Sequence, residues 1–137
     1  MKKYRILILL GTLVIISLSC NKPVHNEAVN PNEIIGSWKL IAVGINPPES
    51  INIKSHIINF SLDGTWDSVT EMTGTWEGTK MKSSGKWALD TNIISYTAGD
   101  SSEKSTMSLT EQGLTLNPDF IIALDGGKIP IDTHYSK

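Results

Sequence analysis

Residues 104–117 read KSTMSLTEQGLTLN. Apolar and polar side chains alternate on both sides of Gln112-Gly113, a pair typical of tight turns. A period of two is typical of a β-strand with one buried face and one solvated face. The stretch therefore predicts two antiparallel strands joined by a tight turn. The side chains expected on the buried face are Ser105, Met107, Leu109, Leu114 and Leu116.

Similar signals extend from this hairpin in both directions. Short runs rich in β-branched and aromatic residues are separated by turn pairs such as Asp63-Gly64 and Thr73-Gly74. After residue 36, no stretch of sequence keeps apolar residues at helical spacing over three turns. We therefore predict an all-β fold, an antiparallel up-and-down arrangement of about eight short strands. The expected strands are 37–43, 51–62, 65–72, 74–80, 84–89, 92–97, 104–110, 114–117 and 120–124.

Two local features modify this pattern. Asn30 is a suitable helix N-cap and Pro31 suits the first helical position, so we expect one helical turn at 31–35. In the long strand that follows, apolar residues stand at odd positions up to Ile57 and at even positions from Ile58. A regular strand cannot bury both sets on one face, so we predict a β-bulge near Ile57-Ile58.

The first residues have the pattern of a secretory signal peptide. Lys2, Lys3 and Arg5 precede an apolar run at 6–18, and small residues follow it. As a helix this run would extend only about 20 Å, short of the roughly 30 Å hydrocarbon core of a bilayer. We therefore predict a cleaved signal peptide at 1–19 rather than a transmembrane helix.

Cys20 is the only cysteine, and it follows Ser17-Leu18-Ser19. This arrangement resembles the lipobox of bacterial lipoproteins, with Ser17 and Leu18 in reversed order. The resemblance implies that Cys20 carries acyl chains such as palmitate and anchors the protein to a membrane of the cell envelope. We expect the outer membrane, with the protein facing the periplasm or the cell surface. Residues 20–33 would form a flexible tether, and 34–137 the folded domain. The alternative is a secreted protein with an incidental Cys.

The charge balance narrows the classes of partner. The chain has 12 Lys and Arg against 14 Asp and Glu, a net charge of −2. Removing residues 1–19 would take away Lys2, Lys3 and Arg5 and no acid, which lowers the net charge to −5 and leaves no Arg. An acidic chain without a basic cluster gives no expectation of nucleic-acid binding. A lone Cys excludes a disulfide framework within the chain.

Residues that commonly carry catalysis or bind metals are scattered. His25, His56 and His134 have no partners at metal-ligand spacing, and no phosphate-binding loop, nucleophile elbow or HExxH motif occurs in the sequence. His56 follows Lys54 and Ser55, so we expect it on the solvated face of its strand. We therefore expect neither an enzyme nor a cofactor or metal site.

Each of the four Trp residues stands two positions after a Gly. Because Gly supplies turns and kinks, each Trp is expected near the start of a strand, and the rings are expected to gather at one end of the sheet. In one interpretation the rings fill the core; in the other, some line a cavity open to a ligand. The candidate ligand-binding residues are Trp38, Phe60, Trp66, Trp76 and Trp87.

Three segments carry a family resemblance: GSWKL at 36–40, NFSLDGTW at 59–66 and GKW at 85–87. Together they resemble the lipocalin-like domains of small bacterial lipoproteins, over roughly residues 34–124. The resemblance implies an up-and-down β-barrel that binds a small hydrophobic or amphipathic molecule, with Gly36 and Trp38 at the G-x-W positions of the first strand. Lipocalins also place a late Arg over this Trp, whereas the only Arg here is Arg5.

Two other functions remain open. A protein-interaction or inhibitor module of the cell envelope would act through its polar loops, expected at 46–50 and 98–103; the sequence indicates no particular protein partner. A glycan-binding module would need a solvent-exposed Trp beside an acid such as Asp67 or Glu77.

Overall fold

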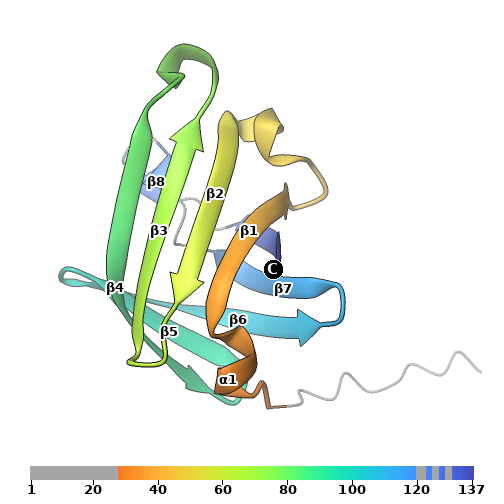
Figure 1. Ribbon diagram of the computed structural model, residues 1–137, viewed down its shortest axis with the longest axis vertical. Coiled ribbons are helices and arrows are strands. Elements are labelled where there is room, and N and C mark those ends of the chain that lie inside the picture. The colour runs from red at the N-terminus through yellow and green to blue at the C-terminus, as the bar shows by residue number, and fades with distance from the viewer. Residues whose placement is uncertain (1–27, 120–122, 125–126, 129–130) are drawn as a thin grey trace, which may run out of the picture.

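The computed structural model describes residues 28–119, 123–124, 127–128 and 131–137, so the expected signal peptide, Cys20 and most of the tether lie outside the described residues. Eight strands form a closed barrel in the order β1-β10-β7-β6-β5-β4-β3-β2 (Figure 1). Each neighbouring pair is antiparallel. Strands β1 to β7 follow one another around the barrel, and β10 closes it between β7 and β1. The predicted all-β antiparallel barrel is confirmed.

The barrel strands are β1 (Gly36–Val43), β2 (Ile53–Phe60), β3 (Thr65–Met72), β4 (Lys80–Asp90), β5 (Ile93–Ala98), β6 (Ser101–Thr110), β7 (Gly113–Asp119) and β10 (Ile131–Ser136). A separate two-stranded sheet pairs β8 (Ala123–Leu124) with β9 (Gly127–Lys128). The described helical segments are short: α1 (Pro31–Ile34) and the 3₁₀ turns η1 (Pro48–Ile51) and η2 (Gly74–Trp76). None of the described helices is long and apolar enough to cross a bilayer.

Helix α1 lies at one end of the barrel, here called the α1 end (Figure 1). The Asn30 side chain accepts a hydrogen bond from the Asn32 backbone N–H at 3.0 Å, and Pro31 occupies the first turn, as predicted. The helix ends one residue before the expected boundary. The Trp38 indole N–H donates to the Ile34 carbonyl at 2.7 Å, which satisfies a carbonyl that the helix leaves without an internal partner.

The opposite end of β1 to β4 carries η1 and η2 and is called the η end (Figure 1). The strand predicted at 74–80 is wrong. Gly74 and Gly78 have φ values of 69° and 82°, in the left-handed region that strands do not use. These residues form η2 and a turn, so β4 begins at Lys80. The Thr73 N–H donates to the Asn52 carbonyl at 2.8 Å, which ties the two connections at this end together.

Side-chain direction in β2 changes earlier than predicted. The register with β3 shifts between Ile53 and Ser55 and is regular from there to the end of the strand. As a result His56 and Ile58 are buried, whereas Ile57 points outward with 40% of its surface exposed. The bulge was predicted near Ile57-Ile58, and this position is wrong, because the register shift lies between Ile53 and Ser55.

Strand β10 is absent from the predicted set, although it closes the barrel. It pairs with β1 on one side and β7 on the other. Its Thr133 and Tyr135 side chains are buried, while Asp132 is exposed. The last predicted strand, 120–124, falls mainly outside the described residues, and its described part is β8.

Aromatic side chains pack the interior at the α1 end. Trp38 and Trp66 are each 3% exposed, and Trp87 packs edge-on against Phe60 with 5.6 Å between ring centroids. Trp76 instead lies in η2 at the η end and is 54% exposed. Three of the four indoles therefore gather at one end, as predicted, and the fourth does not.

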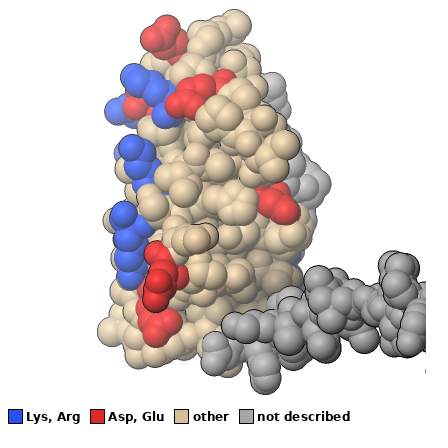
Figure 2. All heavy atoms as spheres, turned by 90° about the vertical axis from the view of Figure 1, so that its right-hand side faces the viewer, with Lys and Arg blue, Asp and Glu red and all other residues tan. Residues whose placement is uncertain are grey.

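Ionic side chains lie on the outside of the barrel. Lys54 pairs with Glu71 at 2.8 Å, and Lys80 approaches the same carboxylate at 4.0 Å. Figure 2 shows lysines along one margin of the molecule, next to a broad uncharged surface. Among the residues whose burial the structure describes, Asp119 is the one Lys, Arg, Asp or Glu that is buried.

Candidate ligand-binding site

His56 of β2 lies fully inside the barrel, which corrects the expectation that it faces solvent. Its Nδ1 is 2.7 Å from Oγ1 of Thr70 on β3. Its Nε2 is the one buried side-chain nitrogen or oxygen in the described part of the chain that has no hydrogen-bond partner. A buried polar group without a partner costs about 1–3 kcal/mol. The structure therefore buries this nitrogen without a partner, at a free-energy cost that a hydrogen-bonding partner would remove.

Tyr135 of β10 lies beside His56, with 5.9 Å between the ring centroids. The Tyr135 hydroxyl donates to Oδ2 of Asp119 at 2.5 Å. The Thr133 hydroxyl donates to the same oxygen. Because Asp119, Thr133 and Tyr135 have no exposed surface, this network lies in the barrel interior.

Two more hydroxyls extend the network. The Tyr96 and Ser105 hydroxyl oxygens are 2.7 Å apart, and Ser105 donates to the carbonyl of Pro118, the residue before Asp119. The barrel thus encloses hydroxyl, imidazole and carboxyl groups from six different strands. We call this set the polar cluster: His56, Thr70, Tyr96, Ser105, Asp119, Thr133 and Tyr135.

Burial shifts the acid–base behaviour of two members of the cluster. Desolvation of the imidazolium lowers the pKa of His56 from 6.5 to about 4, so the ring is neutral at neutral pH. Burial also raises the pKa of Tyr135 well above its ordinary value, and the nearby Asp119 adds to this effect. The cluster consequently offers uncharged imidazole and hydroxyl groups.

A pocket of about 150 Å³ lies at the η end, lined by Met72, Trp76, Thr79 and Met81. Met72 is buried in the core, and Met81 packs against the core. In the strand registers, Met81 pairs with Thr70, and Thr70 pairs with His56. Side chains directly opposite each other on one face are about 5 Å apart. Met81 of the pocket wall is therefore next to Thr70, although no residue of the polar cluster lines the pocket itself.

The five ligand-binding candidates fall into two groups. Trp38, Phe60, Trp66 and Trp87 belong to the packed α1 end and do not line this pocket. The indole N–H groups in this group are occupied: Trp66 donates to the Thr97 carbonyl and Trp87 to the Ser61 carbonyl. Trp76 is the candidate that the structure places at the pocket.

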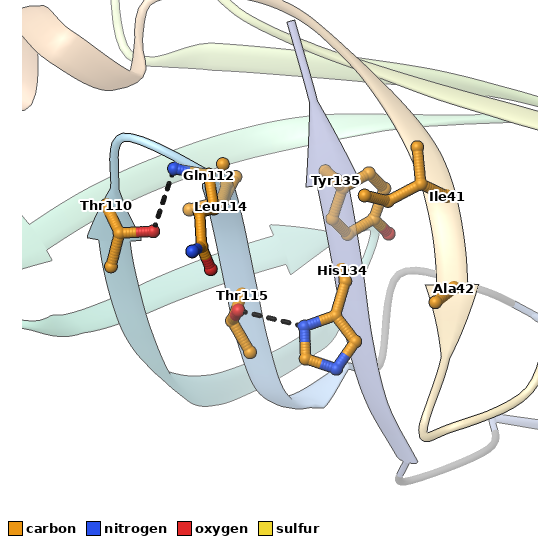
Figure 3. Close-up of a pocket in the computed structure, with 9 residues that line it drawn as sticks. Ile41, Ala42, Thr110, Gln112, Leu114, Thr115, His134 and Tyr135 are labelled. Atoms are coloured by element: carbon orange, nitrogen blue, oxygen red, sulfur yellow. Dashed lines mark hydrogen bonds between the residues drawn. The ribbon is translucent and has the colours of Figure 1, made fainter.

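A second pocket, of about 270 Å³, is shown in Figure 3. It opens on the outer face of the barrel, because Ile41 at its rim is 48% exposed and His134 alternates with the buried Tyr135 along β10. Thr115 Oγ1 and His134 Nδ1 are 3.0 Å apart across it. Its lining holds no buried polar atom that lacks a partner within the described residues.

The loops expected to recognise partners are more structured than predicted. Part of the 46–50 loop forms η1, and Pro48 is buried. In the 98–103 loop, Ala98 pairs with Ser101, so β5 and β6 are joined by the two residues between them. Ile45, three residues before η1, is an apolar loop residue that is fully accessible.

Sequence reasoning missed most of the polar cluster. Two signals could have found it. Counting in steps of two from Phe60 through Ile58 reaches His56, and residues 131–136 alternate apolar or Thr side chains with polar ones. The contact of Asp119 with Tyr135 has no sequence signal, because it depends on the pairing of β7 with β10.

Among the described residues, no three His, Cys, Asp or Glu side chains lie close enough together to hold a metal ion. Comparisons of this chain with protein-family models, with curated proteins and with solved structures found no match.

Proposed function

We propose that the protein is a lipocalin-like carrier that binds a small hydrophobic or amphipathic molecule inside the barrel, entering at the η end. The unpaired Nε2 of buried His56 carries this proposal. An interior whose role is only structural gains nothing from an unsatisfied polar atom, whereas a ligand or a ligand-bound water would supply its partner.

The arrangement of the interior supports an amphipathic ligand. The apolar pocket of Met72, Trp76 and Met81 is next to Thr70, which contacts His56. Ligand sites commonly combine apolar walls with a few polar groups that fix orientation. An apolar chain would lie against the Met and Trp side chains, with its polar group directed toward His56.

Binding can be tested with the full-length chain and the neutral dye Nile red. Trp76→Ala removes the exposed aromatic wall of the pocket, so we expect the affinity for the dye to fall about tenfold. Leu62→Ala is the matched control, because Leu62 is also an exposed apolar turn residue, 79% accessible, but lies in the β2–β3 turn at the α1 end. Equal binding by the wild type and Trp76→Ala would contradict the site.

The proposed setting is the bacterial cell envelope, with the barrel tethered through lipid on Cys20. The support is the order of a basic segment, an apolar run and Cys20 in the sequence. Several acyl chains, at about 0.8 kcal/mol per buried CH₂, would make such anchoring effectively permanent. Incorporation of labelled palmitate by the wild type, and its loss in Cys20→Ser, is the expected result. Labelling that survives Cys20→Ser would refute the anchor.

One observation favours glycan binding as a second candidate. Trp76 is 54% exposed, and the adjacent Glu77 is also exposed. This is the combination that stacking on a sugar face requires. A neutral oligosaccharide such as maltohexaose should then change the Trp76 emission, and Glu77→Gln should weaken the response. No response from the wild type would remove this candidate.

A further inference from the structure

Two methionines lie close together where β3 and β4 are joined at the η end. Met72 is the last residue of β3, and Met81 is the second residue of β4. The Met72 N–H donates to the Thr79 carbonyl at 3.1 Å, so Met72 lies opposite Thr79 and diagonal to Met81. Diagonal neighbours on one face of an antiparallel pair are about 7–8 Å apart, within reach of long side chains. Both methionines line the same pocket of about 150 Å³.

Trp76 lies in the turn between these two strands and lines the pocket with them. Because the indole is 54% exposed, part of it covers the pocket and part faces solvent. Hydrogen bonds within the turn fix its shape. The Thr79 N–H donates to the Trp76 carbonyl at 3.0 Å, and the Glu77 N–H donates to the Gly74 carbonyl at 3.1 Å. The ring is therefore held beside the two methionines by a closed turn, at the tip of the β3–β4 connection (Figure 1).

The chemistry of the lining side chains restricts which metal ion the pocket could bind. Two of the four lining residues supply a thioether sulfur, and Thr79 supplies a hydroxyl. None of these four side chains is a carboxylate, imidazole or thiol, the groups that bind Ca²⁺, Mg²⁺ or Zn²⁺ in proteins. Thioether sulfur is a soft ligand that favours Cu(I). The face of an indole ring also attracts a cation.

We propose that Met72 and Met81 form a binding site for the soft monovalent ion Cu(I), with the Trp76 ring beside the ion. Each Sδ donates a lone pair to the metal, which gives up its solvent ligands, and no atom changes oxidation state. Because Met is unbranched and has three rotatable bonds, both sulfurs can turn toward one ion in the pocket. This site does not depend on the proposed carrier function, since the ion needs the sulfurs and the indole but no contact with His56.

The test uses Ag(I), which is soft and singly charged like Cu(I) but stable in air. The full-length chain carries Cys20→Ser, because a thiol would itself bind silver. Calorimetric titration with silver nitrate in chloride-free buffer should show saturable binding. Met72→Leu and Met81→Leu each remove one sulfur at nearly constant volume, and each should weaken this binding about tenfold or more. Met107→Leu is the matched control and should not weaken it, because Met107 is a core methionine, 1% exposed, that does not line the pocket.

Two spectroscopic signatures separate coordination from a general effect on the fold. X-ray absorption at the silver edge should show sulfur neighbours, and these should be lost when Met72→Leu and Met81→Leu are combined. Bound silver should also quench tryptophan emission. Trp76→Phe should remove this quenching although calorimetry still detects binding, whereas Trp87→Phe should retain it, because Trp87 does not line the pocket.

Each outcome has a distinct meaning. The metal site is overturned if silver does not bind saturably, if it has no sulfur neighbours, or if the three Met→Leu variants bind it as tightly as their parent. None of these results affects the carrier function, which is decided by Nile red binding to the wild type without silver. Silver binding without dye binding would leave the metal site in place and remove the carrier.

Discussion

The ammonium group of Lys137 lies 4.9 Å from the ring centre of Trp38. The same Nζ donates to the Glu33 carbonyl of α1 at 2.9 Å. This lysine therefore connects the end of the chain to both the first barrel strand and the helix beside it.

Replacing Lys137 with Met removes the cation but keeps most of the alkyl chain over Trp38. A cation–π contact at an accessible site contributes about 0.5–1 kcal/mol, and the variant also loses the hydrogen bond to the Glu33 carbonyl, so we expect the free energy of unfolding in urea to fall by at least that amount. Lys137→Arg should preserve it. Lys82→Met is the control, because Lys82 is an exposed strand lysine that forms no ion pair with another described residue, and it should have no measurable effect. Identical losses in both Met variants would argue against the contact.

Gly85 of β4 allows the Trp66 indole to reach across the strand to the Thr97 carbonyl, at 3.2 Å. A Cβ at Gly85 would lie 1.5 Å from that carbonyl oxygen and 3.0 Å from Trp66 Nε1. Gly85→Ala must move the backbone of β5 and break this hydrogen bond. We expect a loss of about 3 kcal/mol in stability, measured by urea unfolding.

The control for Gly85 is Gly99, in the β5–β6 turn. Gly99 has a φ of 59°, and a Cβ added there would have no neighbouring atom within 4 Å. Gly99→Ala therefore costs only backbone strain, about 1–2 kcal/mol. A Gly85→Ala variant no less stable than Gly99→Ala would show that β5 adjusts freely.

The barrel strands were predictable where apolar residues lie on the inner face of a strand and polar residues on the outer face. Met107, Leu114 and Leu116 are buried, as their alternation predicts, and β3 has the expected boundaries. These strands bury apolar side chains against a common core, so local pattern and tertiary packing demand the same register.

The buried polar interior was not predictable for the opposite reason. His56 is polar but buried, because Thr70 and Tyr135 surround it from two other strands. Ile57 is apolar but outward, because the register shift earlier in β2 fixes the direction of every later side chain. The contacts of His56 with Thr70 and Tyr135 form only when the strands pair in the closed barrel. A single sequence shows the residue types but not which strands will bring them together.

Trp76 should be the tryptophan most accessible to a neutral quencher. It is 54% exposed, whereas Trp38 and Trp66 are 3% exposed and Trp87 is partly buried. Acrylamide quenching of the full-length chain should therefore lose its strongest component in Trp76→Phe. Trp87→Phe is the comparison variant and should leave that component in place. A quenching curve that Trp76→Phe does not alter would show that the turn at η2 shields the ring.

The buried imidazole makes stability depend on pH in a defined window. The pKa of His56 is about 4 in the folded protein against 6.5 for an ordinary histidine, so between these values the unfolded chain binds a proton that the folded protein does not. Unfolding is therefore favoured as the pH falls through this range, and the full stability is present above pH 6.5. The difference in pKa corresponds to about 3 kcal/mol.

His56→Gln has no titrating group at position 56, and all of its other titrating groups are those of the wild type. Subtracting its free energy of unfolding from that of the wild type, at a series of pH values between about 4 and 7, should give a curve that falls by about 3 kcal/mol toward acid. Leu62→Ala, at an exposed turn residue that carries no titrating group, should show the wild-type pH dependence. Parallel curves for the wild type and His56→Gln would mean that the imidazole can take up a proton inside the barrel, which requires water or a charged partner at Nε2.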